Sequence, residues 1–153
     1  MKLLYILLFA LTFVSLNAKN IEMLKNACNH NELKKCYELG SLYETGNDGI
    51  KKDPKLAVKY YQKACHNGKM KGCMGLGAMY LYGNKVSKSY QKYLELYNKA
   101  CLGGLYKACD SLGFDYKEGR KVVRQDYRKS AFYYERACQG GIASSCNNLA
   151  EFY

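Results

Sequence analysis

Four pairs of cysteines divide most of this chain into copies of one unit. Eight cysteines occur among its 153 residues, and each pair has the spacing C-x7-C. The first cysteines of successive pairs are 37, 36 and 37 residues apart. A period of this length is typical of stacked supersecondary units. The pairs are Cys28 and Cys36, Cys65 and Cys73, Cys101 and Cys109, and Cys138 and Cys146.

The residues after the second cysteine of each pair predict a helix. Leucine recurs three residues later, glycine or alanine four later and tyrosine seven later. Offsets 0, 3, 4 and 7 lie on one face of an α-helix, so these residues form a buried stripe. A glycine at offset 10, in the left-handed conformation, suits the end of the helix. We call these the A helices and expect them at 32–45, 69–82, 105–118 and 142–153.

A second helix is predicted before the first cysteine of each pair. Asp53, Ser89 and Asp126 stand twelve residues before it and are good N-cap residues. Tyrosine or leucine precedes the cysteine by four residues, and alanine by one. We expect these B helices at 53–67, 89–103 and 126–140, with a shortened copy at 20–29. The chain is therefore predicted to be all-α, an α-solenoid of helical hairpins without strands.

The first eighteen residues have the pattern of a signal peptide. Lys2 is followed by an apolar run from Leu3 to Val14 and by small and polar residues up to Ala18. The run is too short to span a bilayer, although an uncleaved N-terminal anchor is the alternative. We expect cleavage near Ala18 and a secreted or periplasmic mature chain, 19–153, in a compartment where disulfides persist. Its units are expected near 32–68, 69–104 and 105–141, with a partial unit at 142–153.

The repeat resembles a known family. The segment from Leu39 to Gly46 reads L-G-x-x-Y-x-x-G, and the segment from Asp53 to Ala64 reads D-x-x-x-A-x-x-Y-Y-x-K-A. These patterns resemble the Sel1-like repeat, a TPR-like helical hairpin. With cysteines eight apart in every unit, the chain is similar to the Helicobacter cysteine-rich proteins, secreted Sel1-like solenoids to which β-lactamase activity is attributed. The resemblance implies binding of a β-lactam or peptidoglycan-like ligand, with slow hydrolysis as the alternative function.

We interpret the cysteines as one disulfide per repeat, within each C-x7-C pair. A closed loop of about nine residues stabilises the fold by roughly 2.5 kcal/mol in the chain-entropy model. Zinc sites favour C-x2-C or C-x4-C spacing with converging ligands, so we expect no metal and no cofactor. A periodic and even set of cysteines also leaves no thiol for nucleophilic catalysis.

A serine hydrolase site is not evident. Ser89-Tyr90-Gln91-Lys92 matches the S-x-x-K tetrad of serine β-lactamases, but neither S-D-N nor K-T-G occurs. Ser89 occupies the N-cap position at which Asp53 and Asp126 stand, and capping explains it. His30 and His66 are isolated and cannot supply a metallo-β-lactamase site. The catalytic residue of the hydrolase alternative therefore stays unassigned.

The outer faces of the A helices are the predicted recognition surface. Residues at offsets 2, 5, 6 and 9 differ from unit to unit while the buried stripe does not. Such variation is typical of a surface that binds a protein or peptide, and a solvated surface would vary as well. Candidate binding residues are Glu38, Met79, Phe114, Asp115 and Asn148.

The chain is strongly basic, with a formal net charge of +11. A hydrophobic fraction of 48% excludes a disordered basic tail, so the charge belongs to a folded surface. It concentrates in the A-to-B loops and on the B helices. For an exported protein, this charge favours an anionic cell-envelope component or an acidic protein over nucleic acid, and a solvated convex face is the alternative. No B helix follows the last A helix to cover Leu149, Phe152 and Tyr153, so self-association or partner docking there is a further hypothesis.

Overall fold

The predicted all-α solenoid is confirmed. The structure is a computed structural model that describes residue 6 and residues 19–47, 49–83, 86–120 and 123–153. The predicted signal peptide, 1–18, lies outside the described residues apart from residue 6. A helix at 19–29 comes first, and no strand occurs in the described part of the chain. Seven further helices follow: α2 (Leu33–Thr45), α3 (Pro54–His66), α4 (Met70–Tyr82), α5 (Tyr90–Leu102), α6 (Tyr106–Glu118), α7 (Tyr127–Gln139) and α8 (Ala143–Ala150).

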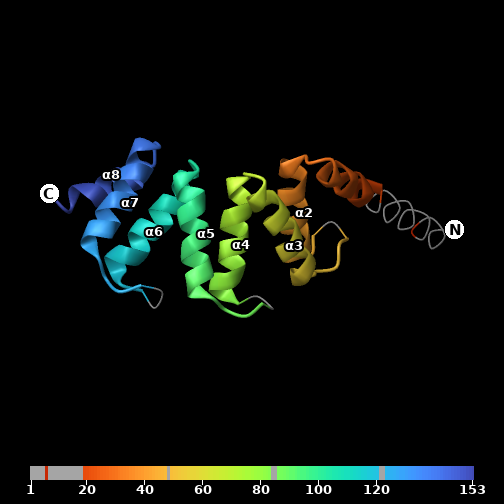
Figure 1. The fold of residues 1–153 in the computed structure, drawn as a ribbon, viewed down its shortest axis with the longest axis horizontal. Coiled ribbons are helices and arrows are strands. Elements are labelled where there is room, and N and C mark those ends of the chain that lie inside the picture. Colours follow the sequence, from red (N-terminus) through yellow and green to blue (C-terminus); the bar gives the residue numbers. More distant parts are fainter. Residues whose placement is uncertain (1–5, 7–18, 48, 84–85, 121–122) are drawn as a thin grey trace.

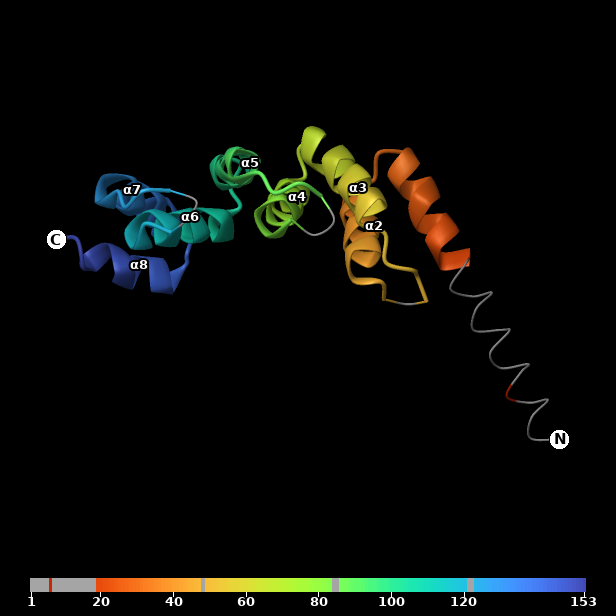
Figure 2. The same cartoon turned by 90° about the horizontal axis from the view of Figure 1, so that it is seen from below.

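The helices stack along an elongated rod, with the helix at 19–29 and α8 at opposite ends of it (Figure 1). The A helix of each hairpin packs against the following B helix, as in the pairs α2 with α3, α4 with α5 and α6 with α7. Figure 2 shows the A helices α2, α4, α6 and α8 as one row and the B helices α3, α5 and α7 as another. In addition, α2 contacts α4 directly.

The helix ends follow from local capping. At the N-terminus of α3, the Asp53 side chain accepts hydrogen bonds from the backbone N–H groups of Lys55 and Leu56. Ser89 and Asp126 cap α5 and α7 in the same way. The A helices α2, α4 and α6 end at glycines with positive φ, which an αL cap requires. These glycines are Gly46, Gly83 and Gly119, at φ 78°, 66° and 58°.

Glycine lets the two helices of each hairpin approach closely. A Cβ atom added to Gly40 would lie 2.5 Å from the Tyr61 ring, and one added to Gly77 would lie 2.7 Å from the Tyr97 ring. The small residue at offset 4 therefore provides the space that the B-helix tyrosine fills. In the third hairpin, the corresponding distance between Gly113 and Tyr134 is 2.8 Å.

One disulfide joins each B helix to the A helix that follows it, which makes four in all. The Cα atoms of the pairs lie between 4.5 and 4.8 Å apart, and no cysteine is free. Disulfides of this kind indicate an oxidising extracellular or periplasmic environment. None of the helices in the described ranges is long and apolar enough to cross a bilayer. The bonds are Cys28–Cys36, Cys65–Cys73, Cys101–Cys109 and Cys138–Cys146.

The last A helix is shorter than predicted. It ends at Ala150 rather than at residue 153, and a turn follows in which the Phe152 N–H donates to the Leu149 carbonyl. The Phe152 ring packs 5.7 Å from the Tyr127 ring, so α7 partly covers it. Leu149 and Phe152 are half-buried, and the Tyr153 side chain is the exposed one, at 97%.

Candidate functional site

The outward residues of the A helices form one surface, which we call the A face. They occupy offsets −2, 2, 5 and 9 from the second cysteine, and all are exposed or half-buried. On a helical wheel these offsets lie opposite the cysteine at offset 0 and the tyrosine at offset 7. Its members are Lys34, Glu38, Ser41, Thr45, Lys71, Gly75, Ala78, Tyr82, Lys107, Ser111, Phe114, Glu118, Ser144, Asn148 and Glu151.

Three of the five predicted binding residues lie on this face and two do not. Phe114 is 41% exposed, and Glu38 and Asn148 are half-buried. The prediction was wrong for Met79 and Asp115, which are 1% and 5% exposed. Both stand at offset 6, next to the buried leucine at offset 3 on the helical wheel. In a solenoid each helix packs on two sides, so the buried arc is wider than the stripe of a helix packed on one side.

Two tyrosine hydroxyls donate hydrogen bonds to carboxylates, one within a hairpin and one between neighbouring hairpins. Tyr61 donates to Glu44 at 2.6 Å, and Tyr93 donates to Asp115 at 2.6 Å. Hydrogen bonds to a charged group contribute about 1.5–3 kcal/mol. The pairs use non-equivalent repeat positions, so the periodicity of the sequence gave no signal for them.

The Asp115 carboxylate is held in a partly apolar site. Burial raises its pKa above the ordinary value, while the hydrogen bond from Tyr93 and the Arg120 guanidinium oppose that rise. Arg120 Nη1 lies 3.8 Å from Asp115 Oδ1, and the guanidinium stacks on the Phe114 ring at 4.8 Å. On the third unit, the Arg120 side chain therefore contacts both the buried Asp115 and the exposed Phe114.

Tyrosines connect the second unit to its neighbours. Burial raises the pKa of Tyr97 to about 12, with smaller contributions from Tyr82, Asp115 and Glu44. The hydrogen bond from Tyr93 on α5 to Asp115 on α6 joins the second unit to the third. The Tyr82 side chain is 72% exposed.

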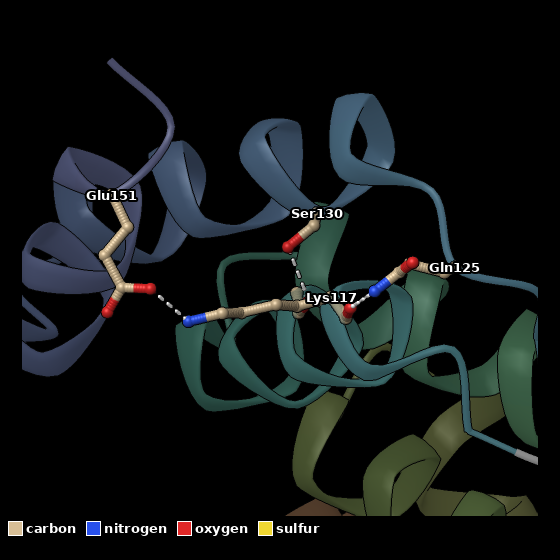
Figure 3. A network of polar contacts seen from close by, with 5 residues as sticks. Lys117, Gln125, Ser130 and Glu151 are labelled. Carbon is tan, nitrogen blue, oxygen red and sulfur yellow. Dashed lines mark hydrogen bonds and ion pairs between the residues drawn. The ribbon is translucent and has the colours of Figure 1, made fainter.

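A polar network holds the C-terminal unit together (Figure 3). The Lys117 ammonium on α6 pairs with the Glu151 carboxylate that follows α8. Gln125 Nε2 donates to the Lys117 carbonyl at 2.8 Å, and Ser130 Oγ donates to the Gly113 carbonyl at 2.8 Å. The end of the A face is therefore fixed to α6 and α7.

The S-x-x-K tetrad has a structural role in the fold. Ser89 Oγ accepts a hydrogen bond from the Lys92 backbone N–H at 3.3 Å. The Lys92 ammonium lies 4.7 Å from the centroid of the Tyr80 ring, as in a cation–π contact. No described residues group three or more histidine, cysteine, aspartate or glutamate side chains in a metal-binding arrangement. His30 and His66 each bond a backbone carbonyl four residues earlier.

These features define an α-solenoid of disulfide-linked hairpins. A model of the Sel1 repeat matches residues 36–69, 71–105 and 107–142, so the chain belongs to the Sel1 repeat family. A comparison with curated proteins gives no match.

Solved structures agree with this assignment. A Sel1 repeat protein from Oxalobacter formigenes is 25% identical, with a TM-score of 0.74, over 87% of this chain and 98% of that one. Helicobacter pylori cysteine-rich protein B is 27% identical, with a TM-score of 0.66, over 87% and 94%. The resemblance to the Helicobacter cysteine-rich proteins is thereby confirmed.

A longer protein contains a similar region. The protective antigen c5321 of uropathogenic Escherichia coli, which has an SLR fold, is 29% identical, with a TM-score of 0.75. The match covers 86% of this chain and 28% of that protein. A disulfide-rich Sel1 scaffold of this kind fits a protein-binding role.

Proposed function

We propose that the protein is an exported scaffold that binds a protein or peptide ligand along the A face. The observation that carries this proposal is the contrast between a constant core and a variable outward surface. Each hairpin keeps the same glycine–tyrosine contact, whereas the outward residues at offsets 2, 5 and 9 change in size and charge from one A helix to the next. Because the outward residues differ from unit to unit, each unit offers a different local contact to an extended ligand.

The chemistry of the A face suits a mixed polar and aromatic ligand. Its helices α2, α4, α6 and α8 carry five basic and five acidic residues, so the row is electrically balanced. Tyr82 and Phe114 are exposed aromatic side chains on adjacent A helices. Aromatic residues of this kind are enriched among the residues that dominate binding energy at protein interfaces.

Peptide selection tests this function. A displayed peptide library is panned on purified oxidised protein, and the selected peptides are titrated against a Tyr82→Ser, Phe114→Ser double variant. We expect affinity to fall at least tenfold, because the two aromatic anchors are lost. The control is Tyr90→Ser with Phe132→Ser, which removes exposed aromatics from the B helices. Equal loss in both variants, or no enrichment, would contradict ligand binding at the A face.

Export is part of the same proposal. The leader pattern at 1–18 and the four disulfides both support a secreted or periplasmic location. Intact mass measurement of protein recovered outside the cytoplasm should give a chain that begins at Lys19 and lacks eight hydrogens. A full-length chain, or one with free thiols, would contradict cleavage near Ala18 or oxidation.

A further inference from the structure

The positive charge of the protein is segregated to the B row. The B helices α3, α5 and α7 carry eight lysine and arginine residues and two acidic residues. The A helices, by contrast, carry equal numbers of each sign. Because the two rows lie on different sides of the rod (Figure 2), the outer surface of the B row is basic while the A face is balanced.

The charge is densest on α3. Lys55, Lys59 and Lys63 follow one another at intervals of four residues, so they lie along one line on the helix. Lys55 and Lys59 are exposed, and Lys63 is half-buried. Two further exposed lysines, Lys51 and Lys52, stand in the loop that precedes α3. We call these five residues the lysine patch.

The repeat itself does not require lysine at these positions. In α5 the equivalent residues include Gln91 and Glu95, whose side chains hydrogen-bond to each other at 3.0 Å. In α7 the equivalent of Lys59 is Phe132, and the guanidinium of Arg136 lies 6.0 Å from the centroid of its ring. The equivalent line therefore includes a carboxylate in α5 and an aromatic ring in α7, whereas in α3 all three residues are cationic.

The lysine patch is destabilising by itself. Like charges at intervals of four residues repel one another on a helix, and α3 contains two such pairs. Among the described residues, no carboxylate lies within ion-pair distance of the five amino groups, whereas Lys129 on α7 has Asp126 at 3.8 Å. An external anionic surface would relieve this repulsion.

We propose that the lysine patch binds the anionic phospholipid surface of a membrane. Lys55 and Lys63 are eight residues apart on α3, so the line of lysines is about 12 Å long and faces more than one lipid headgroup. Lys55, Lys59 and Lys63 follow one another along one side of a helix, so the site suits a planar array of charges rather than an enclosed small anion. Lysine is also a compact point charge that does not need the fixed bidentate geometry of arginine.

This surface lies on a different row from the A face, so the two can be occupied together. The inference therefore does not depend on the proposed function. A protein bound through the lysine patch would hold α3 against the bilayer and leave the A face open to its ligand.

Vesicle sedimentation tests the proposal. Oxidised protein comprising residues 19–153 is mixed with vesicles of phosphatidylcholine alone or with 30% phosphatidylglycerol. We expect binding to the anionic vesicles only, weakened by added salt. The triple variant Lys55→Gln, Lys59→Gln, Lys63→Gln should bind roughly 100-fold more weakly, at about fivefold for each lysine near the surface.

The matched control removes the same charge elsewhere. The variant Lys71→Gln, Lys99→Gln, Lys107→Gln should lose much less than the lysine-patch variant. Equal loss in the two variants would overturn the assignment to the lysine patch, because net charge alone would then explain binding. Tight binding of soluble polyphosphate with no binding to vesicles would overturn the membrane assignment.

Stability gives an independent measurement. The lysine-patch variant should unfold at a higher urea concentration than the wild type, because two repulsive pairs are removed. The control variant, which breaks no such line, should show a smaller shift. A lower unfolding midpoint for the lysine-patch variant would overturn the inference, because the lysines would then be serving the fold.

Discussion

The glycine–tyrosine contact between Gly77 and Tyr97 gives a sharp prediction for the variant Gly77→Ala. The added Cβ atom would lie 2.7 and 2.9 Å from two atoms of the Tyr97 ring and 3.3 Å from Leu96 Cβ. Overpacking of this kind costs about 1–3 kcal/mol. Alanine returns about 1 kcal/mol through its better helix propensity. We therefore expect a net loss of about 1 kcal/mol in the free energy of unfolding.

Urea denaturation followed by circular dichroism measures this loss. The slope of the transition should stay the same while the midpoint falls. The variant Tyr97→Leu supplies the control, because it removes the ring atoms that the new methyl group would meet. In that background Gly77→Ala should be neutral or stabilising, which gives an interaction energy of at least about 1 kcal/mol. A stabilised single variant, or equal effects in both backgrounds, would refute the packing argument.

Two further predictions concern the disulfides and a buried carboxylate. Replacing Cys101 and Cys109 together by alanine should lower the free energy of unfolding by about 2.5 kcal/mol, measured in urea; an unchanged value would show that the cross-link does not restrict the unfolded chain. The pKa of Asp115 is raised in the folded state, so this carboxyl favours folding when protonated, and its contribution is lost as pH rises through the folded pKa. Relative to wild type, Asp115→Asn should therefore gain stability as pH increases from about 4 to 7 in thermal unfolding, and the opposite trend would contradict the sign of the shift.

The periodic part of the fold was predictable because every repeat uses the same residues for the same purpose. The spacing of eight within each cysteine pair predicted the turns, and Asp53, Ser89 and Asp126 predicted where the B helices begin. Helices α2 to α7 consequently begin and end within one residue of their predicted bounds. The last helix was predicted too long, since it ends at Ala150 rather than at residue 153.

The candidate site was less predictable because its contacts are specific to individual repeats. A helical wheel identified Glu38, Phe114 and Asn148 as accessible, but it treated Met79 and Asp115 as equally outward. Their burial depends on how a neighbouring hairpin packs, which a single helix does not encode. The hydrogen bond from Tyr93 to Asp115 joins two positions that no other repeat pairs.

The placement of the disulfides also determines how the backbone is connected covalently. Each bond closes a small ring around a B-to-A turn, and no bond spans an A-to-B loop. A protease cut beside Gly104, inside a ring, leaves both halves of the molecule covalently attached. A cut beside Gly83, between rings, leaves them joined only by packing. The A-to-B loops are therefore the positions at which a single cleavage divides the rod into separable parts.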